Sequence, residues 1–282
     1  MIVATRPDPA AKAVAENFPV ALRVLPRSRR EELMAVYGYA RFVDDLGDEL
    51  AGGPAARLAA LDDPEVELDR AFSGTATHPV FARLAPVIAD HRLDRQPFAD
   101  LIEANRRDQT TTGYETFDDL LGYCRLSANP VGRIVLGLSG CHDADAVALS
   151  DEVCSGLQVV EHLQDVAEDA TRGRIYLPRE DLRAFGVDEG QLLPAGATPA
   201  TVRRLVAFEA GRARRLLAGT AELAARLRGT WKLAIAGFGG GGLAQLAALE
   251  RAGYDVLGPR RPIQADKVAR AAAALRMLRG SR

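Results

Sequence analysis

Four polar side chains recur between residues 150 and 178 at spacings of three, four and four residues: Gln158, Glu161, Asp165 and Asp169. On an α-helix, this spacing places them along one face. Apolar residues run beside this line, so the face is expected to point toward the interior. A row of carboxylates next to a core needs a cation. Mg²⁺ is the usual one, because it prefers oxygen ligands and often bridges one or two carboxylates to a phosphate.

A second acidic pair follows an amphipathic stretch near the N-terminus. Apolar residues at three- and four-residue spacing between positions 33 and 43 predict a helix. Residues 28–31 (SRRE) have the form of a capping box that would begin this helix. Asp44 and Asp48 continue the apolar stripe, and Arg41 lies one turn earlier, where it is placed to contact a phosphate.

Together, the two acidic helices predict a cluster of divalent ions that would bind a diphosphate and stabilise the charge it develops on leaving. Departure of a diphosphate from an allylic or cyclopropyl carbon leaves a carbocation. The pocket must then be apolar, because water would quench the cation early. A solvated helix face is the alternative for either motif alone. Two such motifs, each joined to an apolar stripe, favour a functional site.

The elements that would carry these side chains are helical. Ser150 is a suitable N-cap for the helix of the second motif, and Gly173 is a suitable stop. Residues 117–140 predict a helix kinked at Pro130, and residues 199–227 predict one long helix. Sustained period-two alternation of β-branched residues is absent, so the predicted fold class is all-α.

The composition is typical of a globular protein, with 48% hydrophobic and 26% charged residues in a chain of 282. A net charge of −2 gives no electrostatic case for nucleic-acid binding. The three cysteines lack metal-site spacing and favour a reducing, cytoplasmic setting. No window approaches the roughly 20 apolar residues of a membrane span. We expect a flexible leader at residues 1–14 and a single all-α domain at residues 15–282.

A glycine-rich stretch near the C-terminus raises a different hypothesis. Residues 237–242 (GFGGGG) satisfy G-x-G-x-x-G, the fingerprint of a nicotinamide dinucleotide site. The remaining chain has room for one βαβ unit, whereas a dinucleotide fold needs several parallel strands. The acidic residue expected after the second strand is missing, since residues 257–259 (LGP) stand there. A glycine-rich break between two packed helices is therefore favoured over a cofactor site.

Beyond these motifs, segments across nearly the whole chain resemble the head-to-head prenyl synthases, the family that includes squalene and phytoene synthases. The segments that carry the resemblance occur in this order: ENFPVALRVLP (16–26), VYGYARFVDDLGDE (36–49), DDLLGYCRLSANPVGRI (118–134), LQVVEHLQDVAEDATRGRIYLP (157–178) and ALERAGYDVL (248–257). The resemblance implies an isoprenoid synthase fold, a single helical bundle with a central cavity between the two acidic helices.

The resemblance also implies roles for individual side chains, because the family's two aspartate motifs bind Mg²⁺ and diphosphate. The implied metal ligands are Asp44, Asp48, Asp165 and Asp169. The residues implied to contact diphosphate or the reacting carbons are Arg41, Gln158, Arg172, Arg174 and Tyr123. Glu161 stands where the family commonly has asparagine, and we retain it as a candidate metal ligand whose extra charge could change metal number. His162 is turned about 100° from Glu161, so a packing role is predicted for it.

One segment resembles a particular branch of the family. SANPVG (127–132), together with ENFP near the start and QDV in the second motif, is similar to the hopanoid-cluster branch that converts presqualene diphosphate to hydroxysqualene. The resemblance implies that water, and not hydride from a nicotinamide cofactor, ends the reaction, so no NADPH is expected. Asn129 could hold that water. Capping of the kinked helix before Pro130 is an equally weighted alternative.

Several functional alternatives stay open at this level. The enzyme could instead make presqualene diphosphate from farnesyl diphosphate, or make phytoene from geranylgeranyl diphosphate. A non-enzymatic relative that kept the fold is a further alternative, and the intact acidic motifs speak against it. The substrate partner is a prenyl diphosphate. The sequence leaves open whether a presqualene diphosphate synthase hands it over, and whether the protein touches a membrane peripherally.

Overall fold

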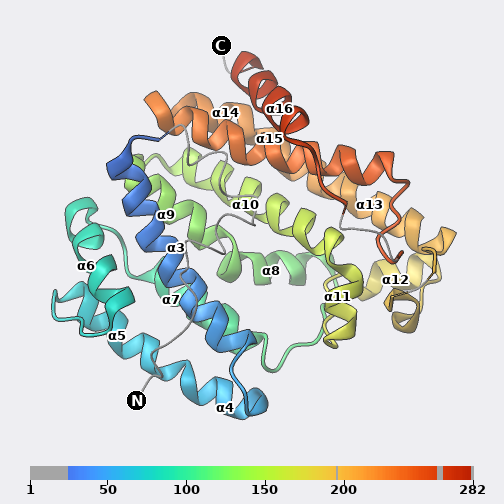
Figure 1. Cartoon of the computed structure of the whole chain (residues 1–282). Helices are drawn as coiled ribbons and strands as arrows, with labels where there is room; N and C mark the ends of the chain where they lie inside the picture. The colour runs from blue at the N-terminus through green and yellow to red at the C-terminus, as the bar shows by residue number, and fades with distance from the viewer. Residues whose placement is uncertain (1–24, 195, 259–262, 281–282) are drawn as a thin grey trace.

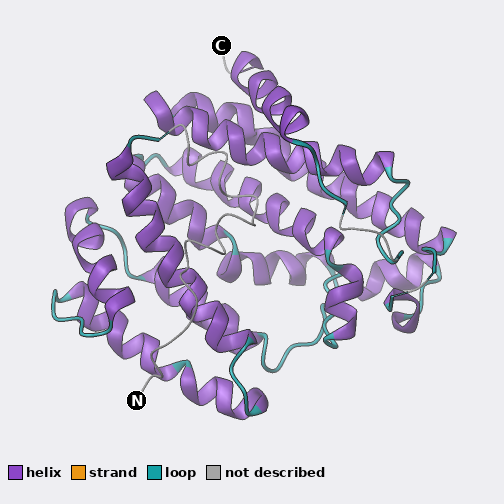
Figure 2. Ribbon diagram, in the orientation of Figure 1, coloured by secondary structure: helices purple, strands orange, loops and turns teal. Residues whose placement is uncertain are grey.

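The computed structural model describes residues 25–194, 196–258 and 263–280. Within these ranges the regular elements are all helical, and one isolated β-bridge joins Gly113 to Ile175 (Figure 2). The helices are α3 (Arg27–Asp48), α4 (Gly53–Ala60), α5 (Asp62–Phe72), α6 (Pro79–His91), α7 (Gln96–Arg107), α8 (Phe117–Ser127), α9 (Asn129–Ser139), α10 (Ala144–Gln164), α11 (Val166–Thr171), α12 (Arg179–Phe185), η1 (Glu189–Leu192), α13 (Ala200–Leu216), η2 (Leu217–Gly219), α14 (Thr220–Arg226), α15 (Gly229–Arg251) and α16 (Lys267–Gly280). The all-α prediction is confirmed. The predicted leader lies outside these ranges.

Helix α10 lies at the centre of the bundle (Figure 1). It packs against α8 and α9 on one side and against α13, α14 and α15 on another, and α16 covers α15. Helix α3 packs against α6 and α7, and α7 in turn packs against α8 and α9. The two acidic helices therefore belong to one bundle and are linked through α7, α8 and α9.

Helix α3 forms as its apolar spacing predicts, and the apolar residues of its inward face are buried. Tyr39 is completely buried, and its hydroxyl donates to the backbone oxygen of Phe98 at 2.8 Å. The predicted capping box is wrong. The helix begins two residues earlier, after Pro26, with no side-chain cap, and Glu31 pairs instead with Arg27 at 2.9 Å. This exposed ion pair uses the carboxylate that a capping box would need.

Helix α10 begins seven residues before the predicted start. Asp143 is its N-cap and accepts a hydrogen bond from the backbone N–H of Asp145 at 3.1 Å, so Ser150 lies buried inside the helix. The helix also ends earlier than predicted, because Asp165 leaves helical geometry (φ −104°, ψ 12°) and a separate short helix, α11, follows. Gly173, with φ +75°, supports the predicted stop. The four polar side chains are thus divided between two helices.

Two other predicted helices are also divided. The kink predicted at Pro130 is a complete break: α8 ends at Ser127, and α9 begins with Pro130 in its first turn, where its missing N–H is not needed. The long helix predicted at residues 199–227 is interrupted by the 3₁₀ turn η2, which carries the fully buried Leu217. Packing of that side chain is a tertiary effect that helix propensity does not encode.

The glycine-rich stretch lies within one continuous helix, α15, so both the cofactor hypothesis and the predicted break are wrong. The described residues supply no strand for a dinucleotide fold. The glycines instead permit close packing on three sides of α15. A Cβ at Gly239 would collide with Thr220 of α14, and one at Gly240 would lie 2.6 Å from the backbone nitrogen of Ala274 in α16. A Cβ at Gly242 would approach α10 and η2.

Helix α15 is also long and apolar enough to cross a membrane by length and composition, which corrects the expectation that no window approaches a span. However, 61% of its most apolar window is buried inside the protein. It packs against α13, α14 and α16 as well as α10. We therefore assign it as a core helix of the bundle.

A buried carboxyl pair gives this fold a pH-dependent stability. Glu209 and Asp181 both contact the Arg212 guanidinium, and Glu209 is 1% exposed. Burial raises the pKa of Glu209 from 4.5 to about 8, and Asp181 adds to the rise while Arg212 opposes it. A raised carboxyl pKa stabilises the folded state at low pH. That contribution is lost as the pH rises toward the folded-state value.

We expect Glu209→Gln to unfold at a higher temperature than the unmodified protein at pH 9, with a smaller difference at pH 6. The amide cannot ionise, so it avoids the cost of a buried second carboxylate beside Asp181. Thermal unfolding at both pH values measures this, with the exposed Glu152→Gln as a control expected to show no pH-dependent change. Equal destabilisation of Glu209→Gln at both pH values would show that Glu209 does not hold a proton.

Candidate active site

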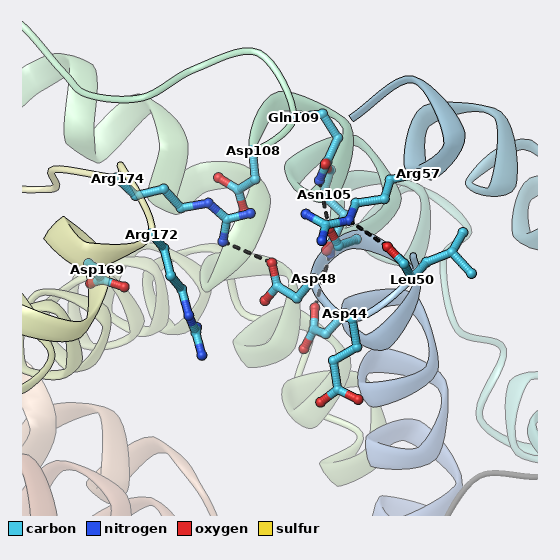
Figure 3. Close-up of polar contacts among 12 residues, drawn as sticks. Asp44, Asp48, Leu50, Arg57, Asn105, Asp108, Gln109, Asp169, Arg172 and Arg174 are labelled. Carbon is cyan, nitrogen blue, oxygen red and sulfur yellow. Dashed lines mark hydrogen bonds and ion pairs between the residues drawn. The ribbon is translucent and has the colours of Figure 1, made fainter. Parts of the chain in front are cut away.

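The C-terminal end of α3 presents Asp44 and Asp48 four residues apart (Figure 3). The Asn105 side chain of α7 donates from Nδ2 to Asp44 Oδ1 at 3.0 Å. Gly47 makes room for this amide, because a Cβ there would collide with the Asn105 side chain. Burial raises the pKa of Asp44 to about 6, and the bond from Asn105 opposes part of the rise. Asp44 is thus fixed in position but carries an incompletely compensated charge.

The second acidic motif lies at the junction of α10 and α11. The backbone N–H of Asp169 donates to the backbone oxygen of Asp165 at 2.8 Å, which orders the turn. Burial raises the pKa of Asp169 to about 7, Asp165 adds to the rise, and Arg172 and Arg174 oppose it. The pKa of Asp165 is also raised, by burial and then by Glu168. A bound cation would relieve this crowding of negative charge.

An ion pair links the segment that follows the second motif to the first motif. Arg174, in the segment after α11, donates from Nη1 to Asp48 Oδ1 at 2.8 Å (Figure 3). The backbone holds this segment in place, because the N–H of Ile175 donates to the oxygen of Thr112 at 2.8 Å, beside the bridge to Gly113. The structure therefore brings both predicted acidic motifs to the same polar site.

A third acid, Asp108, belongs to this site and was not singled out from the sequence. The Tyr123 hydroxyl donates to Asp108 Oδ2 at 2.8 Å, and the Tyr176 hydroxyl lies 3.5 Å from Oδ1. Burial raises the pKa of Asp108 to about 6, Asp48 adds to the rise, and Arg174 opposes it. One feature of the sequence does point to Asp108 as a functional residue. Asp108 directly follows the last turn of α7, where the helix dipole disfavours a carboxylate, and such local contradictions concentrate at functional sites.

Aromatic rings form a wall beside these acids. The His162 and Tyr176 rings stack with centroids 3.7 Å apart, and Tyr123 lies 5.7 Å from Tyr176 and 5.4 Å from Tyr114. His162 Nδ1 lies 3.9 Å from Asp169 Oδ2. Burial lowers the pKa of His162 to about 3, so the ring is neutral. His162 is a packing residue, as predicted, but it packs within the site.

A small cavity of about 10 Å³ lies against this wall, and its lining includes His162, Asp169, Arg174 and Tyr176. That volume is about what one water molecule needs. It is far too small for an isoprenoid chain, so the predicted central cavity stays a prediction.

Two of the arginines expected at a diphosphate instead contact nearby carboxylates. Arg41 Nε lies 2.8 Å from Asp45 Oδ1 and its Nη2 lies 3.2 Å from Glu49 Oε1, while Arg172 Nη2 lies 2.7 Å from Glu168 Oε1. A phosphate contact by either side chain would replace or share these ion pairs. Their predicted roles stay predictions.

The α10 residues of the second motif point in different directions. Gln158 Nε2 lies 3.3 Å from His162 Nε2, which ties it to the aromatic wall. Glu161 is exposed, whereas His162 is buried. The predicted role of Glu161 as a metal ligand stays a prediction.

Asn129 is 4% exposed, and its Oδ1 accepts a hydrogen bond from the Ser155 hydroxyl of α10 at 2.9 Å. The alternative that Asn129 caps the helix is wrong: it is the first residue of α9, the N-cap is Ala128, and no side-chain cap is formed. The side chain instead fixes α9 to α10. Its role in holding water stays a prediction.

The carboxylates of this site are suited to Mg²⁺ that is shared with a bound diphosphate. Among the residues that the structure describes, no three His, Cys, Asp or Glu side chains converge on one metal position. Mg²⁺ does not require such a cage, since it usually takes one or two carboxylates, several waters and the phosphate oxygens of a ligand. Burial is the main cause of the raised pKa values of Asp44, Asp108 and Asp169, and neighbouring carboxylates add to each rise, so a divalent ion would stabilise the ionised forms.

Comparison with known sequences assigns this site to a family. A family model described as squalene/phytoene synthase matches residues 11–267. The chain belongs to the squalene/phytoene synthase family. The resemblance inferred from the sequence is thereby confirmed, as is the isoprenoid synthase fold.

The named relatives of the chain carry two different activities of the family. It is 37% identical over 180 residues to a hydroxysqualene synthase of Zymomonas mobilis, covering 63% of this chain and 59% of that protein. It is 35% identical over 214 residues to the hydroxysqualene synthase of Rhodopseudomonas palustris, covering 76% and 72%. It is also 34% identical over 217 residues to a phytoene synthase of Arthrospira platensis, covering 71% and 69%. Sequence identity alone therefore does not separate the two activities.

Solved structures of the family have the same fold. The squalene synthase HpnC of Alicyclobacillus acidocaldarius superposes with a TM-score of 0.78 at 45% identity, covering 85% of this chain and 89% of that one. A dehydrosqualene synthase in complex with a ligand superposes with a TM-score of 0.84 at 25% identity, covering 95% and 92%. This family bundle thus brings together acidic motifs that lie far apart in the sequence.

Proposed function

We propose that this chain is a hydroxysqualene synthase. It would ionise presqualene diphosphate, rearrange the resulting cation, and let water capture it to give hydroxysqualene and diphosphate. The supporting observation is the ion pair between Arg174 and Asp48, which links the segment after the second acidic motif to the first motif, beside an aromatic wall. The similarity to two hydroxysqualene synthases at 35–37% identity is compatible with this member of the family, and the resemblance of residues 127–132 (SANPVG) to the hydroxysqualene branch favours it.

The acidic residues would act on the leaving group. Mg²⁺ held by Asp44, Asp48, Asp165 and Asp169 would neutralise the diphosphate as it takes the electron pair of the breaking carbon–oxygen bond. The Arg174 guanidinium already pairs with Asp48, and it is placed to contact a phosphate oxygen as well. Asn105 keeps the Asp44 carboxylate in one orientation, so little reorganisation is needed during ionisation.

The aromatic wall would protect the cation that remains. The rings of Tyr114, Tyr123 and Tyr176 lie within 6.0 Å of one another and present π-electrons that stabilise positive charge. Asp108 accepts the Tyr123 hydroxyl proton in a hydrogen bond and thereby fixes that ring. The cyclopropane then opens through cationic rearrangement. Water supplies the electron pair of the new carbon–oxygen bond and releases one proton, so no nicotinamide cofactor is required.

The proposal gives Asn129 a testable role in holding this water. We expect Asn129→Ala to shift the products from hydroxysqualene toward hydrocarbons formed by proton loss. The product ratio should change by about tenfold, which corresponds to a difference of about 1.4 kcal/mol between the two competing steps. Gas chromatography with mass spectrometry measures the product ratio, and Ser155→Ala is the matched control because it removes the Asn129 partner but keeps the amide. An unchanged hydroxysqualene yield in Asn129→Ala would contradict the role.

Two other family activities are the main alternatives. The 34% identity to a phytoene synthase favours condensation of two geranylgeranyl diphosphates, and the same chemistry with farnesyl diphosphate gives presqualene diphosphate. A non-enzymatic relative would not need acids with raised pKa values that converge on one site. A nicotinamide-binding protein has no support, because residues 237–242 are helical.

One experiment separates these activities. The purified protein and Mg²⁺, without nicotinamide, are incubated separately with presqualene, farnesyl and geranylgeranyl diphosphates, and the products are identified by mass spectrometry. Hydroxysqualene from presqualene diphosphate is the expected result. Presqualene diphosphate or phytoene from the shorter precursors would establish an alternative, and no turnover of any substrate would overturn enzymatic function.

We further propose a cytoplasmic location, with the substrate received from a presqualene diphosphate synthase and with peripheral membrane contact. The support is chemical. Presqualene diphosphate is an amphiphile, and hydroxysqualene is a long isoprenoid alcohol that partitions into lipid.

A further inference from the structure

Helix α16 lies at one edge of the bundle, against α15 and α14 (Figure 1). Its inner face is closely packed, because Ala273 and Ala274 lie against Gly240 of α15. This contact fixes which side of α16 faces the core. The opposite side of α16 therefore faces solvent.

The outward side carries an apolar stripe. Val268 is 78% exposed and Leu275 is 55% exposed, and Ala271 between them is also exposed. Their spacing of three and four residues places them on one face of the helix. Val268 is the most exposed large hydrophobic side chain in the part of the chain that the structure describes. The stripe contributes nothing to the core.

Basic side chains flank this stripe. Helix α16 contains four basic residues and no acidic one, although the whole chain has a net charge of −2. By helical geometry, Lys267 lies on one side of the stripe and Arg276 on the other, with Arg279 at its C-terminal end. All three are exposed.

We propose that the outward face of α16 is a docking surface for an anionic lipid bilayer. An apolar stripe between basic flanks lets aliphatic side chains enter the lipid interface while the cations contact the headgroups. A protein partner is less well matched, because the stripe has no aromatic residue of the kind that anchors protein interfaces. The use of this surface, to exchange isoprenoids with lipid, rests on the proposed function. The binding itself does not.

Vesicle co-sedimentation tests the proposal with the full-length protein. We expect binding to vesicles of phosphatidylglycerol and phosphatidylcholine, weak binding to phosphatidylcholine alone, and loss of binding at high salt. Each basic residue near an anionic surface contributes about a fivefold change in affinity. Reversing two charges in Arg276→Glu/Arg279→Glu should therefore weaken binding at least 25-fold, and Leu275→Ser should weaken it severalfold.

Matched controls separate this surface from charge in general. Arg83→Glu/Arg204→Glu makes the same change at exposed positions on α6 and α13 and should bind vesicles as the unmodified protein does. Circular dichroism checks that each variant is folded. Turnover of presqualene diphosphate in detergent should be unchanged by the α16 variants, since α16 contributes no residue to the candidate active site.

Three outcomes would overturn the lipid assignment. One is equal binding to neutral and anionic vesicles, and another is equal loss in the control variant. The third is concentration-dependent dimerisation that Leu275→Ser abolishes without any vesicle binding, which would assign the stripe to a second copy of the chain. A protein that binds anionic vesicles but converts no prenyl diphosphate would contradict only the proposed function.

Discussion

Asp44→Asn is expected to lower diphosphate release from presqualene diphosphate by about 1,000-fold, which corresponds to about 4 kcal/mol of transition-state stabilisation. The amide keeps the size and shape of the carboxylate, and its oxygen can still accept the hydrogen bond from Asn105. It loses the charge that would hold Mg²⁺. Single-turnover assays of diphosphate release measure the effect, and Asp165→Asn is expected to behave in the same way.

The stability of Asp44→Asn should change in the opposite direction to its activity. A carboxyl pKa raised from 3.8 to about 6 stabilises the folded state at low pH, and this contribution is lost as the pH rises through the folded-state value. Without Mg²⁺ at pH 8, the neutral amide should therefore unfold at a higher temperature than the carboxylate. Asp118→Asn, at an exposed position of α8, is the control and should leave turnover unchanged. Near-normal turnover of both motif variants would refute the assignment of the site.

Gly240→Ala and Gly241→Ala are expected to change stability with opposite signs, although they are adjacent and chemically identical. A Cβ at Gly240 would lie 2.6 Å from the nitrogen and 2.8 Å from the Cα of Ala274, so α16 would have to move. Overpacking of this kind costs about 1–3 kcal/mol. A Cβ at Gly241 meets nothing within 4 Å, so alanine there should stabilise the helix by roughly 0.5–1 kcal/mol.

Chemical denaturation of the two variants measures the free energy of unfolding directly. Because each variant adds one methyl group in the same helix, the effect on helix propensity cancels in the comparison. A similar gain in both variants would show that α15 and α16 are not in close contact at Gly240, and would also weaken the assignment of the outward face of α16.

The functional chemistry was more accessible from the sequence than the boundaries of the elements. Asp44 and Asp48 were predicted on α3 because apolar periodicity and four-residue spacing are local properties of one helix. The helix boundaries were less accurate. Ser150 was predicted to be the N-cap of α10, but Asp143 is an equally suitable cap and the intervening residues extend the helix.

The residues missed in the site share one property, which is that their partners come from other elements. Asn105 and Asp108 follow α7 or lie at its end, and neither belongs to a recognisable acidic motif. Their importance comes from contacts with Asp44 and Tyr123, which lie 61 and 15 residues away in the sequence. No local pattern in the sequence encodes those contacts.

The sequence by itself determined the all-α class, the family and both acidic motifs, because these depend on residue types and on their spacing along short segments of the chain. The tertiary structure alone decided that Arg174 reaches Asp48 across 126 residues of chain, and that Asp108 belongs to the same site. It also decided that residues 237–242 are a packing surface for neighbouring helices and not a cofactor loop. The reason is the same in each case: a glycine or a carboxylate acquires its function from whichever element packs against it, and that depends on the whole bundle.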